Sequence, residues 1–554
     1  MPVAERSKRN AVRSIFWIIG IAAAALSAWL NRFFLSSPDG ISYLDIADSY
    51  LRGDWHAAIN AYWSPLYSWL LSAALFFSRP SPEREFAVIK ALNFLSFLAA
   101  FGCFEFLLRE ILLYYRSSAD EEDRLPQTSF TIAGYTIFLW ASLRWTGVQS
   151  DTPDLLTSAA AYAAVALTLR SRRKPGEVSS FISLGLVMAF GYFSKSVFFP
   201  LAFILMAVCF LSLIHSKADR VKVLLAALIF ILLSAPWILD ISKAKGHLTF
   251  GESGKLNYAW FVNPGFRSPN HWQGDQNTGT PQHPERKIFD RPAAYEFSHP
   301  IAGTYPPWYD PSYWFAGLSV KFQMQNHLRV LWRNILFYYD HFLRVLIIAV
   351  LLFLLTGGAL GAFVKALYRN WMILIPAIAG LGLYISAKTH TSMRYIGPFA
   401  ALLFLSVLAS FRFHNGRRQR IGVALLNLAG ISMLILAVVG SLRSKPSGMP
   451  PWLIASAAHQ TGVQRGDQIA IIGDEDDFVY WARLAGVKII AQVPDQKEFS
   501  ANLENQEKVM SALKVAGVDK VLMLTDVHPA RWQPITGTPY SIRFLGDNLR
   551  KDHD

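Results

Sequence analysis

Long apolar segments alternate with short polar ones from residue 14 to residue 440, and the apolar segments then stop. Most of them hold roughly 17 to 25 residues, which as a helix is enough to cross the ~30 Å hydrocarbon core of a bilayer. About eleven spans are predicted on this length criterion, at 14–35, 87–113, 129–147, 154–170, 178–194, 197–214, 222–239, 342–364, 371–387, 395–411 and 421–440. The pattern therefore predicts a polytopic α-helical membrane protein.

One further apolar stretch, 65–77, is too short for a span and suits an interfacial or re-entrant helix. The positions of the basic residues indicate whether this stretch crosses the membrane. If it does not cross and the N-terminus is cytoplasmic, the basic clusters at 170–174, 217–222, 365–369 and 412–420 all fall on the cytoplasmic side. If it does cross, every one of them is translocated, against the positive-inside rule. We therefore expect 65–77 to stay on the outer face.

This topology leaves three segments outside: loops 36–85 and 240–333, and the tail from 441. Residues 1–440 are thus expected to form a transmembrane domain, and 441–554 a soluble periplasmic domain. Within the first loop, Ile41, Leu44, Ala47 and Leu51 share one face of a predicted amphipathic helix, 41–51, at the membrane surface.

The tail alternates apolar runs typical of buried strands with helical patterns. Strands are predicted at 468–473, 487–493 and 520–524, and helices at 478–485 and 506–516. This order is typical of a small α/β domain with parallel strands. Its first helix lacks a GxGxxG fingerprint, so a dinucleotide site is not predicted.

Composition supports a membrane protein and excludes several other classes. The chain is 53% hydrophobic and 17% charged, with a mean hydropathy of +0.27. Its net charge of +14 lies mainly in the short loops between spans, which argues against a nucleic-acid partner. Cys103 and Cys209 each sit inside an apolar run, so neither a disulfide framework nor a thiolate zinc site is expected.

Two carboxylates near the outer membrane surface are the sharpest chemical signal. Asp39 follows the first span in a Pro-Asp-Gly turn, and Asp154 stands where the chain enters the fourth span. The alternative is structural, because an aspartate also caps turns and helix N-termini. Four further aspartates remain candidates, but a solvated face is the stronger interpretation for each: Asp45, Asp48, Asp54 and Asp151.

Three cations lie in outward loops, namely Lys195, Lys388 and Arg394. Snorkelling to the membrane surface is the alternative for each. It explains Arg394 least well, because this residue begins a span on the side where positive charge is disfavoured. A planar guanidinium also suits bidentate contact with a lipid phosphate. The long loop adds aromatic residues that could stack on sugar or anchor at the interface: Trp260, Trp272, Trp308, Tyr309 and Trp314.

Several segments resemble motifs of one family. They are PDGISYLDIADSYLRGDW and WSPLYSWLLSAALF in the first loop, TPDLLTSAAAYAAVAL around Asp154, FSKSVFFPL around Lys195, and APWIL at a span end. Together, over roughly residues 10 to 400, they resemble the GT-C superfamily of lipid-dependent glycosyltransferases, in particular the aminoarabinose transferases of lipid A and the protein O-mannosyltransferases. Two departures are that Gly40 replaces the usual acidic residue after the first aspartate, and that Trp63 and Ser64 replace a Glu-Lys pair.

The resemblance implies an inverting glycosyltransferase of the bacterial inner membrane that takes sugar from a polyprenyl-phosphate donor. Its acceptor would be a lipid, glycan or protein at the periplasmic face. Asp39 would act as general base or metal-linked carboxylate, and Asp154 would help to hold the donor phosphate or a divalent metal ion. The resemblance and the loop chemistry give the remaining roles: phosphate binding by Lys195, Lys388 and Arg394, and substrate binding by Tyr43, Trp63, Trp308 and Tyr309.

A transporter or flippase of lipid-linked sugars is the rival prediction from another class. Many spans with few charges inside the membrane describe a permease as well. Against it, the spans show no inverted repeat, and the acidic residues sit at the outer edge rather than at the midplane.

Overall fold

A computed structural model describes residues 3–116, 124–263, 271–300, 303–385, 392–412, 416–443, 446–501, 503–525 and 531–546. The chain divides into two compact units, each built from separate stretches of sequence. The first contains residues 1–30, 93–264 and 321–445, and the second contains 31–92, 265–320 and 446–554.

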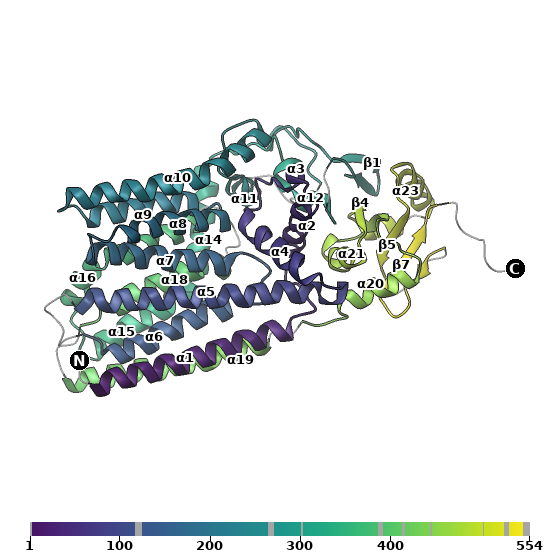
Figure 1. Cartoon of the computed structure of the whole chain (residues 1–554). Coiled ribbons are helices and arrows are strands. Elements are labelled where there is room, and N and C mark those ends of the chain that lie inside the picture. The colour runs from purple at the N-terminus through teal and green to yellow at the C-terminus, as the bar shows by residue number, and fades with distance from the viewer. Residues whose placement is uncertain are drawn as a thin grey trace. The chain divides into compact units, whose positions relative to one another are not determined.

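Helices make up the first unit, and they lie side by side (Figure 1). In chain order they are α1 (Val3–Leu30), the main part of α5 (Pro82–Arg116), α6 (Gln127–Trp140) with the π-helical turn η1 (Ala141–Thr146), α7 (Asp154–Arg173), α8 (Val178–Ser194), α9 (Phe198–Ser212), α10 (Lys217–Lys245), α11 (Ser253–Phe261), α14 (Met324–Tyr338), the π-helical turn η2 (Tyr339–Leu343), α15 (Arg344–Leu355), α16 (Leu360–Arg369), α17 (Trp371–Ile385), α18 (Met393–Leu408) and α19 (Gly416–Arg443).

The protein is a multi-pass membrane protein. Within the residues that the structure describes, five helical segments are long and apolar enough to cross a bilayer: 7–30, 82–114, 217–245, 324–355 and 418–443. Helices α16 and α17, bent by 79° at their junction, pass the same test as a pair. Every predicted span overlaps a helix, and the predicted polytopic helical class is confirmed.

The predicted edges of the span at 342–364 are wrong. The helix begins at Met324 and runs through η2 to Leu355. Charged residues in its first half, Arg329, Arg333 and Asp340, interrupt the apolar pattern there and hide the true start. The outer loop predicted to end at 333 therefore ends about three helical turns earlier.

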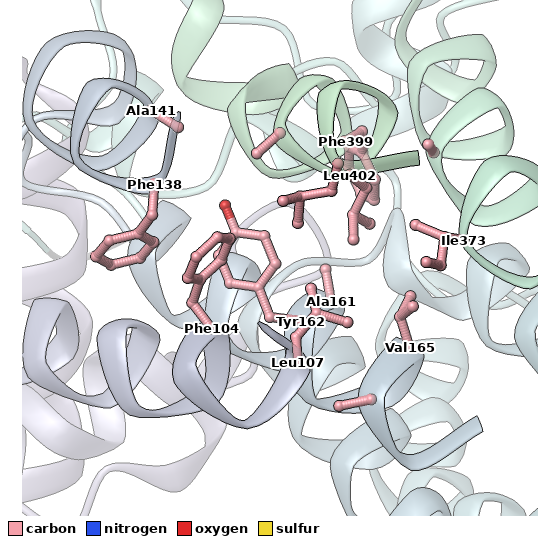
Figure 2. Packing of buried hydrophobic residues seen from close by; sticks show 14 of the residues in the cluster. Phe104, Leu107, Phe138, Ala141, Ala161, Tyr162, Val165, Ile373, Phe399 and Leu402 are labelled. Atoms are coloured by element: carbon pink, nitrogen blue, oxygen red, sulfur yellow. The ribbon is translucent and has the colours of Figure 1, made fainter. Parts of the chain in front are cut away.

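The core of the first unit surrounds α7. Every residue of this helix from Asp154 to Leu169 is buried. Its run of alanines lets neighbouring helices approach closely, as small residues do in membrane interiors. Figure 2 shows Tyr162 of α7 beside Phe104 of α5 and Phe138 of α6, with ring centroids 5.1 and 6.2 Å from that of Tyr162. An interior helix held on all sides fixes the position of its first residue, Asp154.

The second unit combines the first long loop, part of the loop predicted at 240–333, and the tail. Helices α2 (Asp39–Leu51), α3 (Trp55–Ala58) and α4 (Pro65–Ser78) come from the first loop, and the start of α5 follows them. The short helix predicted at 65–77 is thus present as α4, and its 14 residues reach only about 21 Å. Helix α2 does not lie with one face buried and the other exposed, as an amphipathic helix at a membrane surface would. Nine of its residues, on several faces, are buried.

A seven-stranded mixed sheet forms the rest of the second unit. Its strands are β1 (Arg286–Asp290), β2 (Ala293–Glu296), β3 (Gln468–Ile472), β4 (Lys488–Val493), β5 (Lys520–Leu524), β6 (Gln533–Pro534) and β7 (Tyr540–Phe544), in the order β1-β2-β4-β3-β5-β7-β6. Strand β3 pairs in parallel with both β4 and β5, as the predicted α/β tail requires. The other strands add antiparallel edges, two of them from the long loop.

The second unit contains helices that the sequence predicts and helices that it does not. Those predicted in the tail are α21 (Val479–Ala485) and α23 (Leu503–Val515). The others are α12 (Pro306–Tyr309), α13 (Pro311–Trp314), α20 (Pro451–Gln460), α22 (Gln496–Ala501) and the 3₁₀ turn η3 (Glu475–Asp477). Helix α23 packs its apolar face on the sheet through Val509, Met510 and Leu513.

Candidate active site

In the first unit, one buried carboxylate gathers two cations from distant parts of the chain. Asp154 is 2% exposed, and its Oδ1 atom forms an ion pair with the ammonium group of Lys195. Its Oδ2 atom accepts a hydrogen bond from the hydroxyl of Thr152 at 2.6 Å and lies 3.9 Å from Nε of Arg394. The structure thus brings together three of the predicted site residues, from positions 154, 195 and 394.

Helix ends set the positions of these three groups. Asp154 is the first residue of α7, where a negative charge is favoured by the helix dipole. Lys195 ends α8 at its tight connection to α9. Arg394 lies in the first turn of α18, whose N-cap residue, Ser392, accepts a hydrogen bond from the Arg394 amide.

The ring of Tyr395 gives both cations a common surface. The Lys195 ammonium nitrogen lies 4.0 Å from the ring centroid, and Cζ of Arg394 lies 4.8 Å from it. The Arg394 guanidinium also donates to the Tyr395 hydroxyl at 2.8 Å. Both cationic side chains remain about one fifth exposed, at 20% and 18%. They can therefore still reach a ligand.

The arrangement is suited to an anion. The ionisable side chains of Asp154, Lys195 and Arg394 sum to a formal charge of about +1. The N-terminus of α18 adds the positive end of a helix dipole to the same place. A phosphate group would accept charge-assisted hydrogen bonds from both cationic side chains. We refer to these three residues and Tyr395 as the cation cluster.

In the second unit, Asp39 lines a cavity of about 350 Å³. Asp39 is the first residue of α2 and is half-buried, with one carboxylate oxygen 3.4 Å from the indole nitrogen of Trp308. The cavity is lined by Pro38, Asp39, Ile41, Ser42, Asp45, Tyr305, Trp308, Asp474, Glu475, Asp476 and Val479. We call it the Asp39 cavity. Its walls come from the first loop, the long loop and the tail.

The wall from the tail is acidic. Burial, followed by the neighbouring carboxylates of Glu475, Asp474, Asp477 and Asp39, raises the pKa of Asp476 to about 6. Glu475, Asp476 and Asp477 form the 3₁₀ turn η3, and the side chain of its N-cap residue, Asp474, accepts from the Asp476 amide at 3.0 Å. The Asp39 cavity therefore presents carboxylates and an indole ring to whatever enters it.

Gln492 of β4 connects two walls of the Asp39 cavity. Its amide oxygen accepts from the Tyr305 hydroxyl at 2.6 Å, and its amide nitrogen donates to Glu475 at 3.2 Å and to the Gly473 carbonyl at 2.8 Å. His271 also contacts the amide oxygen, at 3.2 Å. Since Gln492 is only 1% exposed, these bonds hold the two walls in one arrangement.

The predicted substrate-binding aromatics divide sharply. Trp308 is half-buried and lines the Asp39 cavity, whereas Tyr43, Trp63 and Tyr309 are buried in packing contacts. Trp63 donates to the Trp308 carbonyl at 3.1 Å and so helps to hold the backbone of that residue in place. Three other tryptophans of the long loop, for which sugar stacking and interfacial anchoring were both open, are less than 10% exposed, namely Trp260, Trp272 and Trp314.

Other predicted residues are placed as follows. Lys388 lies outside the described residues. The solvated faces expected for the additional aspartates are wrong for Asp45 and Asp151, which are 5% and 0% exposed. Asp54 caps α3 by accepting from the Ala57 amide at 3.1 Å. Within the described ranges, no three His, Cys, Asp or Glu side chains are grouped so that they could hold a metal ion.

Sequence reasoning missed three parts of the site. Tyr395 directly follows Arg394, and an aromatic residue beside a lone arginine at a span mouth could have suggested a cation–π contact. The acidic run at 474–477 was visible in sequence, but only the fold brings it to Asp39. Arg483, in the same way, contacts carboxylates more than 390 positions away.

The chain has the fold seen in solved structures of ArnT. The structure of ArnT from Cupriavidus metallidurans in the apo state aligns with a TM-score of 0.54 at 12% identity, over 98% of this chain and 100% of that chain. ArnT from the same organism bound to undecaprenyl phosphate aligns with a TM-score of 0.55 at 11% identity, over 98% and 99% of the two chains.

A third solved structure, the oligosaccharyltransferase of Archaeoglobus fulgidus in the apo form, aligns with a TM-score of 0.49 at 13% identity, over 92% of this chain and 69% of that chain. No family model matches the chain. No curated protein matches it either.

Proposed function

We propose that the protein is an inverting glycosyltransferase that moves a sugar from a polyprenyl-phosphate donor to a lipid, glycan or protein acceptor. The observation that carries the proposal is the cation cluster, in which Lys195 and Arg394, both still partly exposed, meet at the carboxylate of Asp154. In this proposal residues 1–440 form the transmembrane domain of a bacterial inner-membrane protein, with a cytoplasmic N-terminus and a periplasmic tail, 441–554.

The cation cluster is the proposed site of the donor phosphate. Lys195 offers a compact charge and Arg394 a planar fork, and both types of donor pair well with phosphate oxygens. The fold likeness to ArnT, which has been solved bound to undecaprenyl phosphate, supports a donor of this class. Asp154 would keep the two cations in place while the donor is absent and moderate their mutual repulsion.

Asp39 is the proposed general base. It would take the proton from an acceptor hydroxyl as that oxygen attacks the anomeric carbon of the sugar. The bond from the anomeric carbon to the phosphate oxygen breaks in the same step, so polyprenyl phosphate leaves with one more negative charge on its phosphate. Lys195 and Arg394 would stabilise that charge. A single displacement of this kind inverts the anomeric carbon.

A divalent ion does not fit the donor set at Asp154. Its Oδ1 atom is paired with Lys195, and its Oδ2 atom accepts from Thr152 with Arg394 nearby. Two neighbouring cations would repel a metal ion. We therefore derive the reaction from Asp39 and the cation cluster alone.

Arg394→Met is expected to weaken the binding of undecaprenyl phosphate by about ten- to a hundredfold, the effect of losing a charge-assisted hydrogen bond. Lys195→Met is expected to act in the same direction. Binding would be measured with the purified protein in detergent by titration with undecaprenyl phosphate.

Arg170→Met is the matched control. Arg170 lies in the last turn of α7, 16 residues or about 24 Å along the helix from Asp154, and pairs with Glu177 at 2.6 Å. It removes an arginine ion pair from the same helix without touching the cation cluster. Equal affinities for the wild type and the Arg394→Met and Lys195→Met variants would exclude the cluster as the phosphate site.

A further inference from the structure

A single arginine of the tail binds three carboxylates of the second unit. Arg483 of α21 is buried, with its side chain 10% exposed. One terminal nitrogen donates to Asp45 at 2.8 Å and to Asp48 at 2.5 Å, and Nε donates to Glu85 at 2.8 Å. Three negative charges thus meet on one side chain of the tail.

Asp45 extends this contact to the long loop. One of its carboxylate oxygens accepts from the Thr304 amide at 2.7 Å, and the other accepts from the Thr304 hydroxyl at 3.0 Å as well as from Arg483. Asp45 is 5% exposed, so these bonds replace the water that the carboxylate loses. The pair of Asp45 and Arg483 therefore joins three segments: α2, the loop at 303–305, and α21.

The same three segments line the Asp39 cavity. Helix α2 begins with Asp39 and carries Asp45 less than two turns later. Tyr305, next to Thr304, and Val479, the first residue of α21, also line the cavity. Asp45 itself lines the Asp39 cavity on one side and the cavity that contains Arg483 on the other. Arg483 is thus set behind the wall that carries Asp39.

We propose that Arg483 is a positioning residue for sugar transfer, which holds α2 and its first residue, Asp39, against the long loop and the tail. The inference rests on the proposed function, since it names the residue that positions the same Asp39. It also assigns the tail a role: α21 and the turn before it complete the Asp39 cavity. The tail is then a part of the catalytic machinery.

Removing the guanidinium is expected to affect turnover far more than donor binding. A reacting group that is misplaced by about 1 Å through a distant mutation can cost about a hundredfold in rate. Arg483→Met should therefore lower kcat by about that factor and leave the affinity for undecaprenyl phosphate unchanged. Arg483→Lys, which keeps the charge but loses the fork that reaches Asp45 and Glu85 together, should recover only part of the loss.

Arg543→Met is the matched control from the same domain. Arg543 makes a bidentate pair with Glu507, at 3.0 and 2.7 Å, and lines no wall of the Asp39 cavity. The experiment compares kcat, KM for the acceptor, affinity for undecaprenyl phosphate, and thermal unfolding across the wild type, Arg483→Met, Arg483→Lys and Arg543→Met. A wild-type kcat in Arg483→Met, or an equal loss in Arg543→Met, would overturn the inference.

If Arg483→Met does not fold, Asp45→Asn is the variant that tests the positioning role. It keeps the size of the side chain and leaves Arg483 two carboxylates, yet weakens the link to α2. A lowered kcat at unchanged donor affinity supports the positioning role, and a wild-type kcat overturns it. An inactive wild-type protein would contradict the proposed function and the inference together, whereas an active wild type with active Arg483 and Asp45 variants contradicts the inference alone.

Discussion

Asp39→Asn is expected to lower kcat for sugar transfer by about 10²- to 10⁴-fold, the usual contribution of a positioned general base. An asparagine has nearly the same shape and can still accept from the Trp308 indole, which lies 3.4 Å from the Asp39 carboxylate. The fold and the affinity for undecaprenyl phosphate should therefore stay unchanged. The measurement is single-turnover transfer of labelled sugar by the purified variant.

Asp54→Asn provides the control for this loop. Asp54 caps α3 through the Ala57 amide, a role that asparagine fills equally well, and it does not line the Asp39 cavity. Transfer by this variant should match the wild type. Undiminished transfer by Asp39→Asn would contradict the general-base role of Asp39. The carboxylates at 474–476 in the same cavity would then be the next candidates for the general base.

Asp154→Asn is expected to destabilise the first unit by about 3 kcal/mol, because it leaves two partly buried cations without the carboxylate that both approach. Polyprenyl phosphate should compensate, since its phosphate supplies the lost negative charge. The rise in unfolding temperature on adding undecaprenyl phosphate should thus be larger for Asp154→Asn than for the wild type. Thermal unfolding in detergent, with and without the lipid, measures both effects.

Asp219→Asn is the matched control for Asp154. Asp219 also lies in the first turn of a helix and pairs with a lysine, Lys222, at 2.7 Å. Lys195 precedes α9 and Asp219 follows it, so the 15 residues of this helix, about 22 Å, lie between them along the chain. Undecaprenyl phosphate should therefore stabilise this variant and the wild type equally. The same lipid-induced shift in Asp154→Asn would show that Asp154 does not neutralise a phosphate site.

Much of the fold follows from the sequence because its signals are local. A span is recognised from about 20 consecutive residues, and a buried strand from five or six. Prediction failed where a local signal was mixed: the charges in α14 hid the start of its span, and the short strands β1 and β2 lie in a loop without a strong alternating pattern. Strand β2 pairs with β4 of the tail, a long-range contact, and β1 pairs with β2.

The candidate site was predictable in its residues and not in its groupings. Charge at a span mouth is costly, so Asp154, Lys195 and Arg394 each stand out in the sequence. The contacts of Lys195 and Arg394 with the Asp154 carboxylate depend on how α7, α8 and α18 pack. The burial of Asp45 does not follow from its local sequence. A solvated face was expected for this residue, whereas α2 is surrounded by other chain segments.

The aromatic residues of the long loop illustrate the same limit. Tryptophan serves equally as a buried packing residue, an interfacial anchor or a sugar platform, and composition does not separate these roles. In the structure only Trp308 of the predicted substrate-binding aromatics lines the Asp39 cavity. Trp314, by contrast, is buried and donates to the Pro306 carbonyl at 2.9 Å.

Transfer of labelled sugar from a panel of undecaprenyl-phosphate sugars to membrane lipid, glycan and protein extracts tests the central claim most directly. The proposed function predicts that the purified protein transfers at least one sugar with inversion of the anomeric carbon and releases undecaprenyl phosphate. Asp39→Asn should abolish that transfer while still binding the lipid. A wild-type protein that binds undecaprenyl-phosphate sugars, transfers none of them to any extract, and instead moves them across a bilayer when reconstituted in vesicles would contradict the claim and identify a flippase.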